Sequence, residues 1–224
     1  MAAAICRELV ALLLSNLAAL LSIVAISMPT WSTSALSPST PKAAFTAGVW
    51  GLCFHTANEP ALNNCFGYNR AIDYNITLAK VQGVCEMYST STLLSTTAGI
   101  PNEAFTRFMD NVCGSHGTAA LVLAGFGVAC GLLAALALVL HVTICKRKLR
   151  SLPRVALWSL GLSCVFGIAA LGTWAAIAGG LAGSGVAFGA SFLLQVFAVA
   201  LGAVALGMLA WHTSPPQDFS QLLK

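Results

Sequence analysis

The sequence predicts an all-α membrane protein that crosses the bilayer four times, with one large disulfide-tied segment between its first two spans. Composition gives the first observation: of 224 residues, 58% are hydrophobic and only 8% are charged. Soluble domains carry about 25% charged residues, so this chain cannot cover a water-facing surface. The second observation is that its apolar residues gather into four stretches, each at least as long as the roughly 20 residues that a helix needs to span hydrocarbon.

The four apolar stretches are residues 9–28, 118–145, 155–182 and 186–211, and none contains Asp, Glu, Lys or Arg. A backbone in lipid must satisfy its own hydrogen bonds, and runs this long and this uniformly apolar favour helices over barrel strands. Pairs of small residues predict close helix packing within the bundle, with lateral association between copies as the alternative. These pairs are Gly127 with Gly131, Ser163 with Gly167, and Gly185 with Gly189.

The orientation of the spans follows from the connector 146–154, which holds five of the eleven basic residues. Short connectors rich in Lys and Arg stay in the cytoplasm, so this connector is predicted to be cytoplasmic. Residues 1–8 and 212–224 then lie inside the cell, and residues 29–117 and the turn 183–185 lie outside at the plasma membrane. The basic residues are Lys146, Arg147, Lys148, Arg150 and Arg154.

A cleaved signal peptide over residues 1–28 is the alternative to a first membrane helix, because Arg7 precedes an apolar run. The apolar core of a signal peptide has about 7–15 residues, and this run is longer. The length favours a retained helix with a cytoplasmic N-terminus.

The segment 29–117 carries four of the eight cysteines, and an oxidising compartment favours their pairing. Residues 44–54 alternate as a strand does, and a turn-rich stretch separates Cys53 from Cys65. This pattern predicts a short hairpin closed by a Cys53–Cys65 disulfide. Cys85 and Cys113 remain as the second pair, although four cysteines allow three connectivities.

Two kinds of modification site are also predicted. Asn75-Ile76-Thr77 is an N-glycosylation acceptor within the segment expected outside the cell. Cys6 and Cys145 lie at the expected membrane boundary, where cysteines accept palmitate. Plain unmodified cysteines are the alternative at both positions.

The order Trp31, then Trp50-Gly51-Leu52-Cys53, then Cys65 resembles the extracellular signature of the claudin superfamily. That superfamily includes claudins, peripheral myelin protein relatives and auxiliary subunits of glutamate receptors and calcium channels. The four spans, the large first loop and the short second loop match as well. The resemblance implies a left-handed four-helix transmembrane bundle with a small extracellular antiparallel β-sheet in the first loop. It is to a divergent member, because Cys53 replaces the usual second Trp and the Cys85/Cys113 pair is not a claudin feature.

No sequence motif points to catalysis, a cofactor, a metal, nucleic acid or a small-molecule substrate, so we expect no enzyme. Polar residues within the spans are few, and a proton or ion path needs ionisable groups there. We expect His141, near the end of its span, to be solvated. We expect Asn16 and Gln195 to hydrogen-bond neighbouring helices.

Two functions remain for a four-span protein of this kind. The first is a structural, adhesive or membrane-organising role, in which the extracellular sheet contacts other copies of the chain, as at a cell junction. The alternative is an auxiliary subunit that docks on a larger membrane protein, such as a channel or receptor, and modulates it. The expected partners are the lipid bilayer and either other copies or that larger protein.

Overall fold

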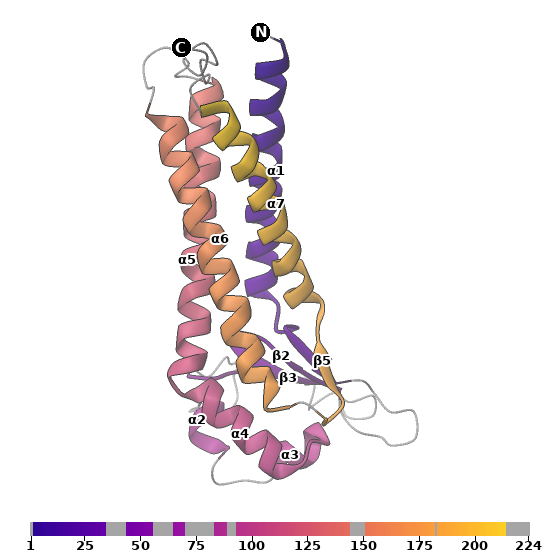
Figure 1. The fold of residues 1–224 in the computed structure, drawn as a ribbon. Coiled ribbons are helices and arrows are strands. Elements are labelled where there is room, and N and C mark those ends of the chain that lie inside the picture. Colours follow the sequence, from indigo (N-terminus) through magenta and orange to yellow (C-terminus); the bar gives the residue numbers. More distant parts are fainter. Residues whose placement is uncertain are drawn as a thin grey trace, which may run out of the picture.

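The four predicted helices are all present and are long and apolar enough to cross a membrane (Figure 1). A computed structural model describes residues 2–34, 44–55, 65–69, 83–88, 93–143, 151–181 and 183–213. The candidate spans within these ranges are Leu9–Ser27, Ser115–Thr143, Leu152–Gly179 and Ala190–Trp211. The chain is therefore a multi-pass membrane protein.

The helices of the bundle are α1 (Ala2–Ser27), α5 (Ser115–Thr143), α6 (Leu152–Gly179) and α7 (Ala190–Thr213). The most extensive packing joins α5 to α6 and α1 to α7. The beginning of α1 and the end of α7 lie at the same end of the bundle, opposite the sheet (Figure 1). The ends of each predicted span differ from the ends of its helix by no more than four residues, except that α1 begins earlier, at Ala2.

Small residues lie at the contacts between helices, as two of the three predicted pairs require. The hydroxyl of Ser163 in α6 donates a hydrogen bond of 2.7 Å to the carbonyl oxygen of Gly127 in α5. Gly131 also packs against Ser163, and Gly167 packs against Val199 and the amide of Gln195 in α7. Lipid offers no hydrophobic drive for helix association, so this close fit holds the bundle together.

Large apolar side chains cover the outward surface of the bundle. Leu13, Leu136, Val165 and Phe197 are more than half exposed, as lipid-facing residues should be. Trp158 and Trp211 are also strongly exposed, on the parts of α6 and α7 that lie away from the sheet. Trp is enriched where a membrane meets water, and their position fits such a belt.

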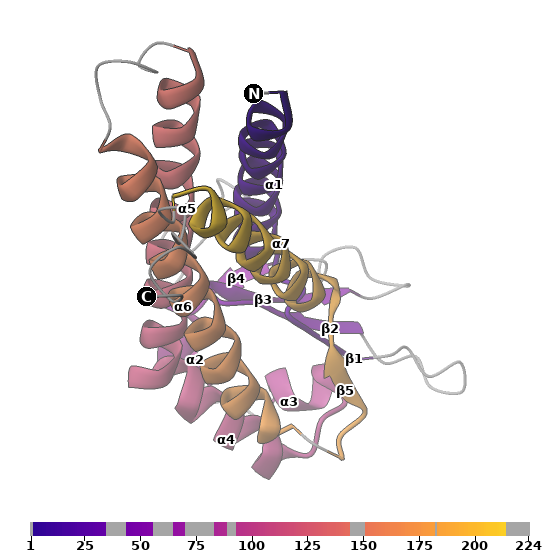
Figure 2. The ribbon, with the colours of Figure 1, turned by 45° about the horizontal axis from the view of Figure 1, so that its top comes forward.

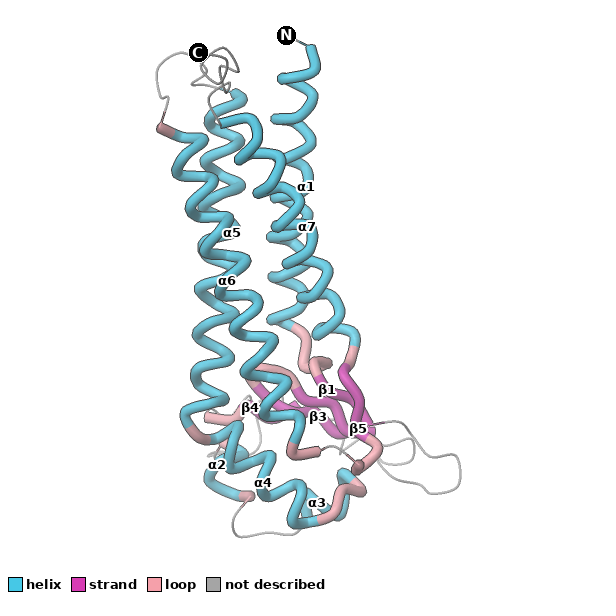
Figure 3. Tube along the Cα trace, viewed as in Figure 1, coloured by secondary structure: helices cyan, strands magenta, loops and turns pink. Residues whose placement is uncertain are grey.

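A five-stranded antiparallel sheet with strand order β4-β3-β2-β1-β5 lies at one end of the bundle (Figure 3). In the register, Ser32 pairs with Ala47 on one side and with Phe188 on the other, and Cys53 lies opposite Cys65. The strands are β1 (Ser32–Ser34), β2 (Ala44–Ala47), β3 (Gly51–His55), β4 (Cys65–Gly67) and β5 (Val186–Phe188).

Two predictions about this sheet are wrong. Residues 44–54, read as one strand, form β2 and β3, with a turn from Gly48 to Trp50 between them. The fourth span was expected to begin at Val186, but that residue begins β5, and α7 starts only at Ala190. Gly183 and Gly185, with φ of 88° and 76°, turn the chain after α6, and residues 186–188 then form a strand by pairing with β1. Gly185 and Gly189 are therefore not a helix-packing pair.

Three helices lie beside the sheet, and sequence reasoning had placed none of them: α2 (Val84–Met87), α3 (Leu93–Ala98) and α4 (Asn102–Cys113). We call these helices together with the five strands the sheet layer. Figure 2 shows α3 and α4 lying along one side of the sheet. Ring contacts of Phe45 in β2 with Phe105 and Phe108 in α4 show that α4 covers this face. One hydrophobic core therefore lies between the sheet and its helices.

A substitution at the junction of β5 with α7 tests how closely the sheet layer packs against the bundle. A Cβ added at Gly189 would collide with the backbone carbonyl of Thr30. We expect Gly189→Ala to lower the free energy of unfolding by roughly 1–3 kcal/mol, the usual cost of overpacking. Thermal unfolding of the purified protein in detergent, followed by circular dichroism, measures the change.

The matched control is Gly207→Ala on α7, where an added Cβ meets nothing within 4 Å. Alanine is the better helix former, so this variant should be as stable as the parent chain or slightly more stable. Equal stability of the two variants would contradict the close approach at Gly189.

Candidate functional site

Trp31 lies at the joint between the bundle and the sheet layer. Its side chain is fully buried, and its indole Nε1 donates a hydrogen bond of 2.7 Å to the carbonyl oxygen of Ala25 in α1. Its ring packs edge-on against Trp174 of α6 and Phe192 of α7, with centroids 5.8 and 6.1 Å apart. One side chain thus touches three of the four membrane helices.

Polar groups around this joint are paired with one another. The indole of Trp174 donates to the hydroxyl of Ser32 in β1, at 3.1 Å. The hydroxyl groups of Thr30 and Ser191 share a hydrogen bond of 2.5 Å, and the backbone N–H of Gly189 donates to the carbonyl of Trp31. An unpaired buried donor costs about 1–3 kcal/mol, so this pairing makes the joint stable.

Trp50 makes a second attachment to α1. Its indole donates to the carbonyl oxygen of Ser27, the last residue of α1, at 3.1 Å. Gly51 follows, and it lets β3 approach the carbonyl of Phe66 more closely than any side chain would allow. Leu52 is fully buried in the core of the sheet layer. The residues of the sequence signature therefore mount and pack the sheet.

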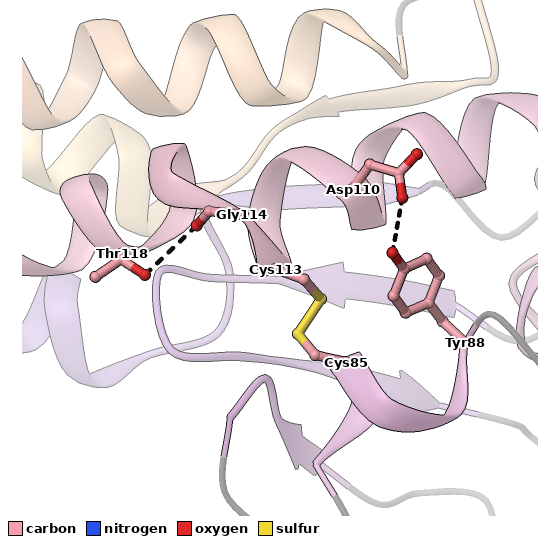
Figure 4. The surroundings of a disulfide bond; sticks show 6 residues. All are labelled: Cys85, Tyr88, Asp110, Cys113, Gly114 and Thr118. Carbon is pink, nitrogen blue, oxygen red and sulfur yellow. Dashed lines mark hydrogen bonds between the residues drawn. A yellow bond between two sulfur atoms is a disulfide. The ribbon is translucent and has the colours of Figure 1, made fainter.

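Both predicted cysteine pairs lie at disulfide distance. Cys53 and Cys65 face each other across β3 and β4, with Cα atoms 4.1 Å apart. Cys85 and Cys113 join α2 to the end of α4, with Cα atoms 5.6 Å apart (Figure 4). In the chain-entropy model, loops of these lengths give roughly 3 kcal/mol of stabilisation for each bond.

The exposed surface of α4 is polar. The hydroxyl of Tyr88 donates to a carboxylate oxygen of Asp110 at 2.7 Å, beside the Cys85–Cys113 bond (Figure 4). This hydrogen bond, with some burial and the negative charge of Asp110, raises the pKa of Tyr88 above its usual value. One turn away, Arg107 and Glu103 form an exposed ion pair at 2.6 Å. The surface thus presents both signs of charge.

Tyr68, next to β4, differs from Tyr88 in its surroundings. Its side chain is only 4% exposed, and its hydroxyl has no hydrogen-bond partner among the described residues. Burial raises its pKa, because the charged phenolate would lose its hydration. The group therefore stays neutral.

Within the membrane helices, two of the three polar predictions, those for Asn16 and His141, are wrong. The amide of Asn16 donates to the carbonyl of Leu12 in its own helix, at 2.8 Å, and not to a neighbouring helix. Gln195 is 5% exposed and lies against Gly167 of α6, so it does face another helix. His141 is half-buried, with its Nδ1 buried and unpaired among the described atoms, and is not simply solvated. No cluster of three His, Cys, Asp or Glu residues occurs within the described ranges.

Some predicted sites cannot be placed. Asn75 and Cys145 lie outside the described residues. Cys6 belongs to α1, and its side chain is not among those described. Glycosylation at Asn75 and palmitoylation at Cys6 and Cys145 stay predictions.

Sequence reasoning missed two contributors to the site. Helix α4 had a clear signal, because Phe105, Phe108, Met109 and Val112 recur at the spacing of one helix face, and all four are buried. Trp174 had none, since a tryptophan within an apolar span is equally suited to contact lipid. Its role depends on Trp31 and Ser32, which are far away in the sequence.

No protein-family model matches the chain, and no curated protein matches it either.

The joint at Trp31 gives a direct test of how the sheet layer is mounted. Trp31→Phe removes the donor to Ala25 and leaves space beside Trp174. We expect a loss of roughly 1–3 kcal/mol in the free energy of unfolding, from the unpaired carbonyl and the cavity together. Denaturant unfolding, monitored by tryptophan fluorescence and far-ultraviolet circular dichroism, measures it.

Trp158→Phe is the matched control, because Trp158 is 72% exposed on α6. It should change stability by less than about 0.5 kcal/mol. If both variants lost the same stability, Trp31 would not be a special attachment point.

Proposed function

We propose that this protein is a divergent relative of the claudin superfamily with a structural, adhesive or membrane-organising role at the plasma membrane. In this proposal the sheet layer lies outside the cell and contacts other copies of the chain. The observation that carries the proposal is the mounting of the layer: Trp31 and Trp50 fix it to the end of α1 through hydrogen bonds. A surface held firmly on a membrane bundle suits contact with a partner.

The kinship is supported by where the signature residues lie. Trp31, Trp50 and Gly51 gather where the sheet meets the bundle or closes on itself. Cys53 and Cys65 pair across adjacent strands. The resemblance in sequence order thus corresponds to one connected structural unit.

We place the contacting surface on the exposed side of α4 rather than on the open sheet. Phe105 and Phe108 of α4 cover the apolar face of the sheet, so that face is not free for a partner. Glu103, Arg107 and Asp110 remain exposed on the other side of the helix. Charges of both signs give such a surface a means to recognise a complementary copy.

The membrane helices offer less support for docking on another membrane protein. Close helix contacts in lipid use small residues. Gly127, Gly131, Ser163 and Gly167 are already used inside the bundle. Large aliphatic and aromatic side chains, such as those of Leu136 and Phe197, are exposed on the outward surface and suit lipid. We therefore favour the adhesive role over the auxiliary-subunit role.

The hydrogen bonds to α1 also support the retention of the first helix. Ala25 and Ser27 of α1 accept the indole protons of Trp31 and Trp50. Cleavage after residue 28 would remove the helix that carries both acceptors from the chain that carries both donors, and it would leave three spans. We therefore propose that α1 is retained, with both termini in the cytoplasm.

Epitope accessibility tests this orientation. A tag placed before Cys6 should be hidden in intact cells and reached only after permeabilisation, because the basic connector 146–154 holds that side in the cytoplasm. A tag beside Glu59 should be reached in intact cells. Immunofluorescence with and without detergent makes the measurement.

A tag between Lys148 and Arg150 is the control, and it should behave like the N-terminal tag. Its detection in intact cells would invert the orientation and remove the sheet layer from the outside. Loss of the N-terminal tag from the mature protein would instead indicate a cleaved signal peptide.

Mixed cell cultures test the adhesive role. We expect a fluorescently tagged chain to accumulate at borders between two expressing cells and not at borders with cells that lack it. Arg107→Glu should abolish the accumulation, because it reverses one charge on the contacting surface. The exposed Glu103–Arg107 pair contributes no more than about 1 kcal/mol to folding, so the variant should still fold.

Ser115→Glu is the matched control, since Ser115 is exposed at the start of α5, beyond the end of α4. An acidic residue is favourable at a helix N-terminus, so this variant should fold and accumulate normally. Equal accumulation at all borders would contradict the proposal. Purification of a fixed-ratio complex with a larger channel or receptor would favour the auxiliary-subunit role instead.

A further inference from the structure

A cavity of about 520 Å³ lies between the sheet and the first turns of α5. Val49, Trp50 and Tyr68 line it from the sheet side. Val112, Thr118 and Leu121 line it from α4 and α5. Sites for small molecules usually have volumes of about 300–1,000 Å³, so this cavity is large enough to hold one.

The cavity lies level with the end of α1. Ala19 of α1 packs against Gly131 of α5. Eight residues further on, α1 ends at Ser27, and α5 runs the opposite way (Figure 1). At 1.5 Å per residue, Leu121 then lies within about 3 Å of the level of Ser27. Ser27 accepts the hydrogen bond from Trp50, which itself lines the cavity.

On the side away from the sheet, the cavity continues into the lipid-facing surface of α5. Leu121, Val122 and Phe126 are 40%, 46% and 56% exposed. Large exposed apolar residues on a membrane helix mark the depth of hydrocarbon. The cavity therefore lies where hydrocarbon gives way to the polar layer of a membrane.

The lining is apolar on the side nearer the membrane helices, and polar without charge on the side nearer the sheet. Asn69 and Thr118 supply polar groups, and no described lining residue is charged. The hydroxyl of Thr118 is held only loosely, by a bond of 3.4 Å to the carbonyl of Gly114 (Figure 4). Such groups can donate hydrogen bonds to ester oxygens, and they provide no counter-charge for an anionic head group.

We propose that this cavity binds one membrane glycerolipid with no net charge. An acyl chain lies along Leu121, on the membrane side of Trp50, and the ester groups lie beside Asn69 and Thr118. Lipid tails are as apolar as the lining, so selection comes from the fit of the chain and from the hydrogen bonds. A glycerolipid is the occupant because every bilayer supplies it at this depth.

Photocrosslinking tests the site. The full chain is reconstituted in phosphatidylcholine vesicles that contain a trace of phosphatidylcholine with a diazirine near the carboxyl end of one acyl chain. Parallel vesicles contain a photoreactive sterol. After illumination, peptide mass mapping locates the label, and mapping under non-reducing conditions checks both disulfides.

Label should concentrate on residues 112–121 and around Trp50. Leu121→Trp fills the cavity and should reduce that label about fivefold or more, equivalent to roughly 1 kcal/mol of lost fit. Leu132→Trp is the control, because Leu132 is 47% exposed on the same helix and lies away from the cavity. It should leave the label unchanged.

Three results would overturn the proposal. The first is label spread evenly over the exposed faces of the four helices. The second is label that persists in Leu121→Trp with both disulfides intact. The third is stronger labelling of the cavity by the sterol probe than by phosphatidylcholine, which would assign the site to a different class of lipid.

Discussion

The hydrogen bond from the indole of Trp31 to the carbonyl of Ala25 is the contact on which the sheet layer depends. A helix leaves its last four carbonyl groups without partners. At the end of α1, the N–H of Met28 bonds to Val24, Trp31 bonds to Ala25, and Trp50 bonds to Ser27. The sheet therefore caps the helix that carries it. Capping and attachment are one set of bonds, so neither can be lost without the other.

This attachment leads to a core that does not divide into domains. Trp174, Ile177 and Leu181, from α6 and the turn after it, belong to the same buried cluster as Phe45 and Phe108 of the sheet layer. The Cys85–Cys113 bond then closes α4 over that cluster. The segment 29–117 is consequently not an independent module on a stalk. Its apolar face is completed by a membrane helix, and a force on α4 is transmitted directly to α6.

The sequence predicted the features that depend on local pattern. The four spans follow from apolar length, and the Cys53–Cys65 hairpin follows from alternation and a nearby turn. Helix α4 was available from the spacing of Phe105, Phe108, Met109 and Val112 but was not recognised. Strand β5 was not available, because Val186–Phe188 looks like the start of a membrane helix. It becomes a strand only by pairing with β1, about 150 residues earlier, and no local preference records that.

The two edges of the sheet, at β5 and at β4, contact the bundle in different ways. On the β5 side, paired polar groups around Trp31 and Gly189 fix the strands to α1 and α7. On the β4 side, a cavity lies between Tyr68 and Leu121 of α5. A lipid in that cavity would therefore support the β4 edge of the layer, beside the bond from Trp50 to Ser27. Cys113 at the end of α4 is bonded to Cys85, and the backbone N–H of Cys85 donates to the carbonyl of Tyr68, which lines the cavity. The lipid would therefore also influence how α4 presents its charged surface.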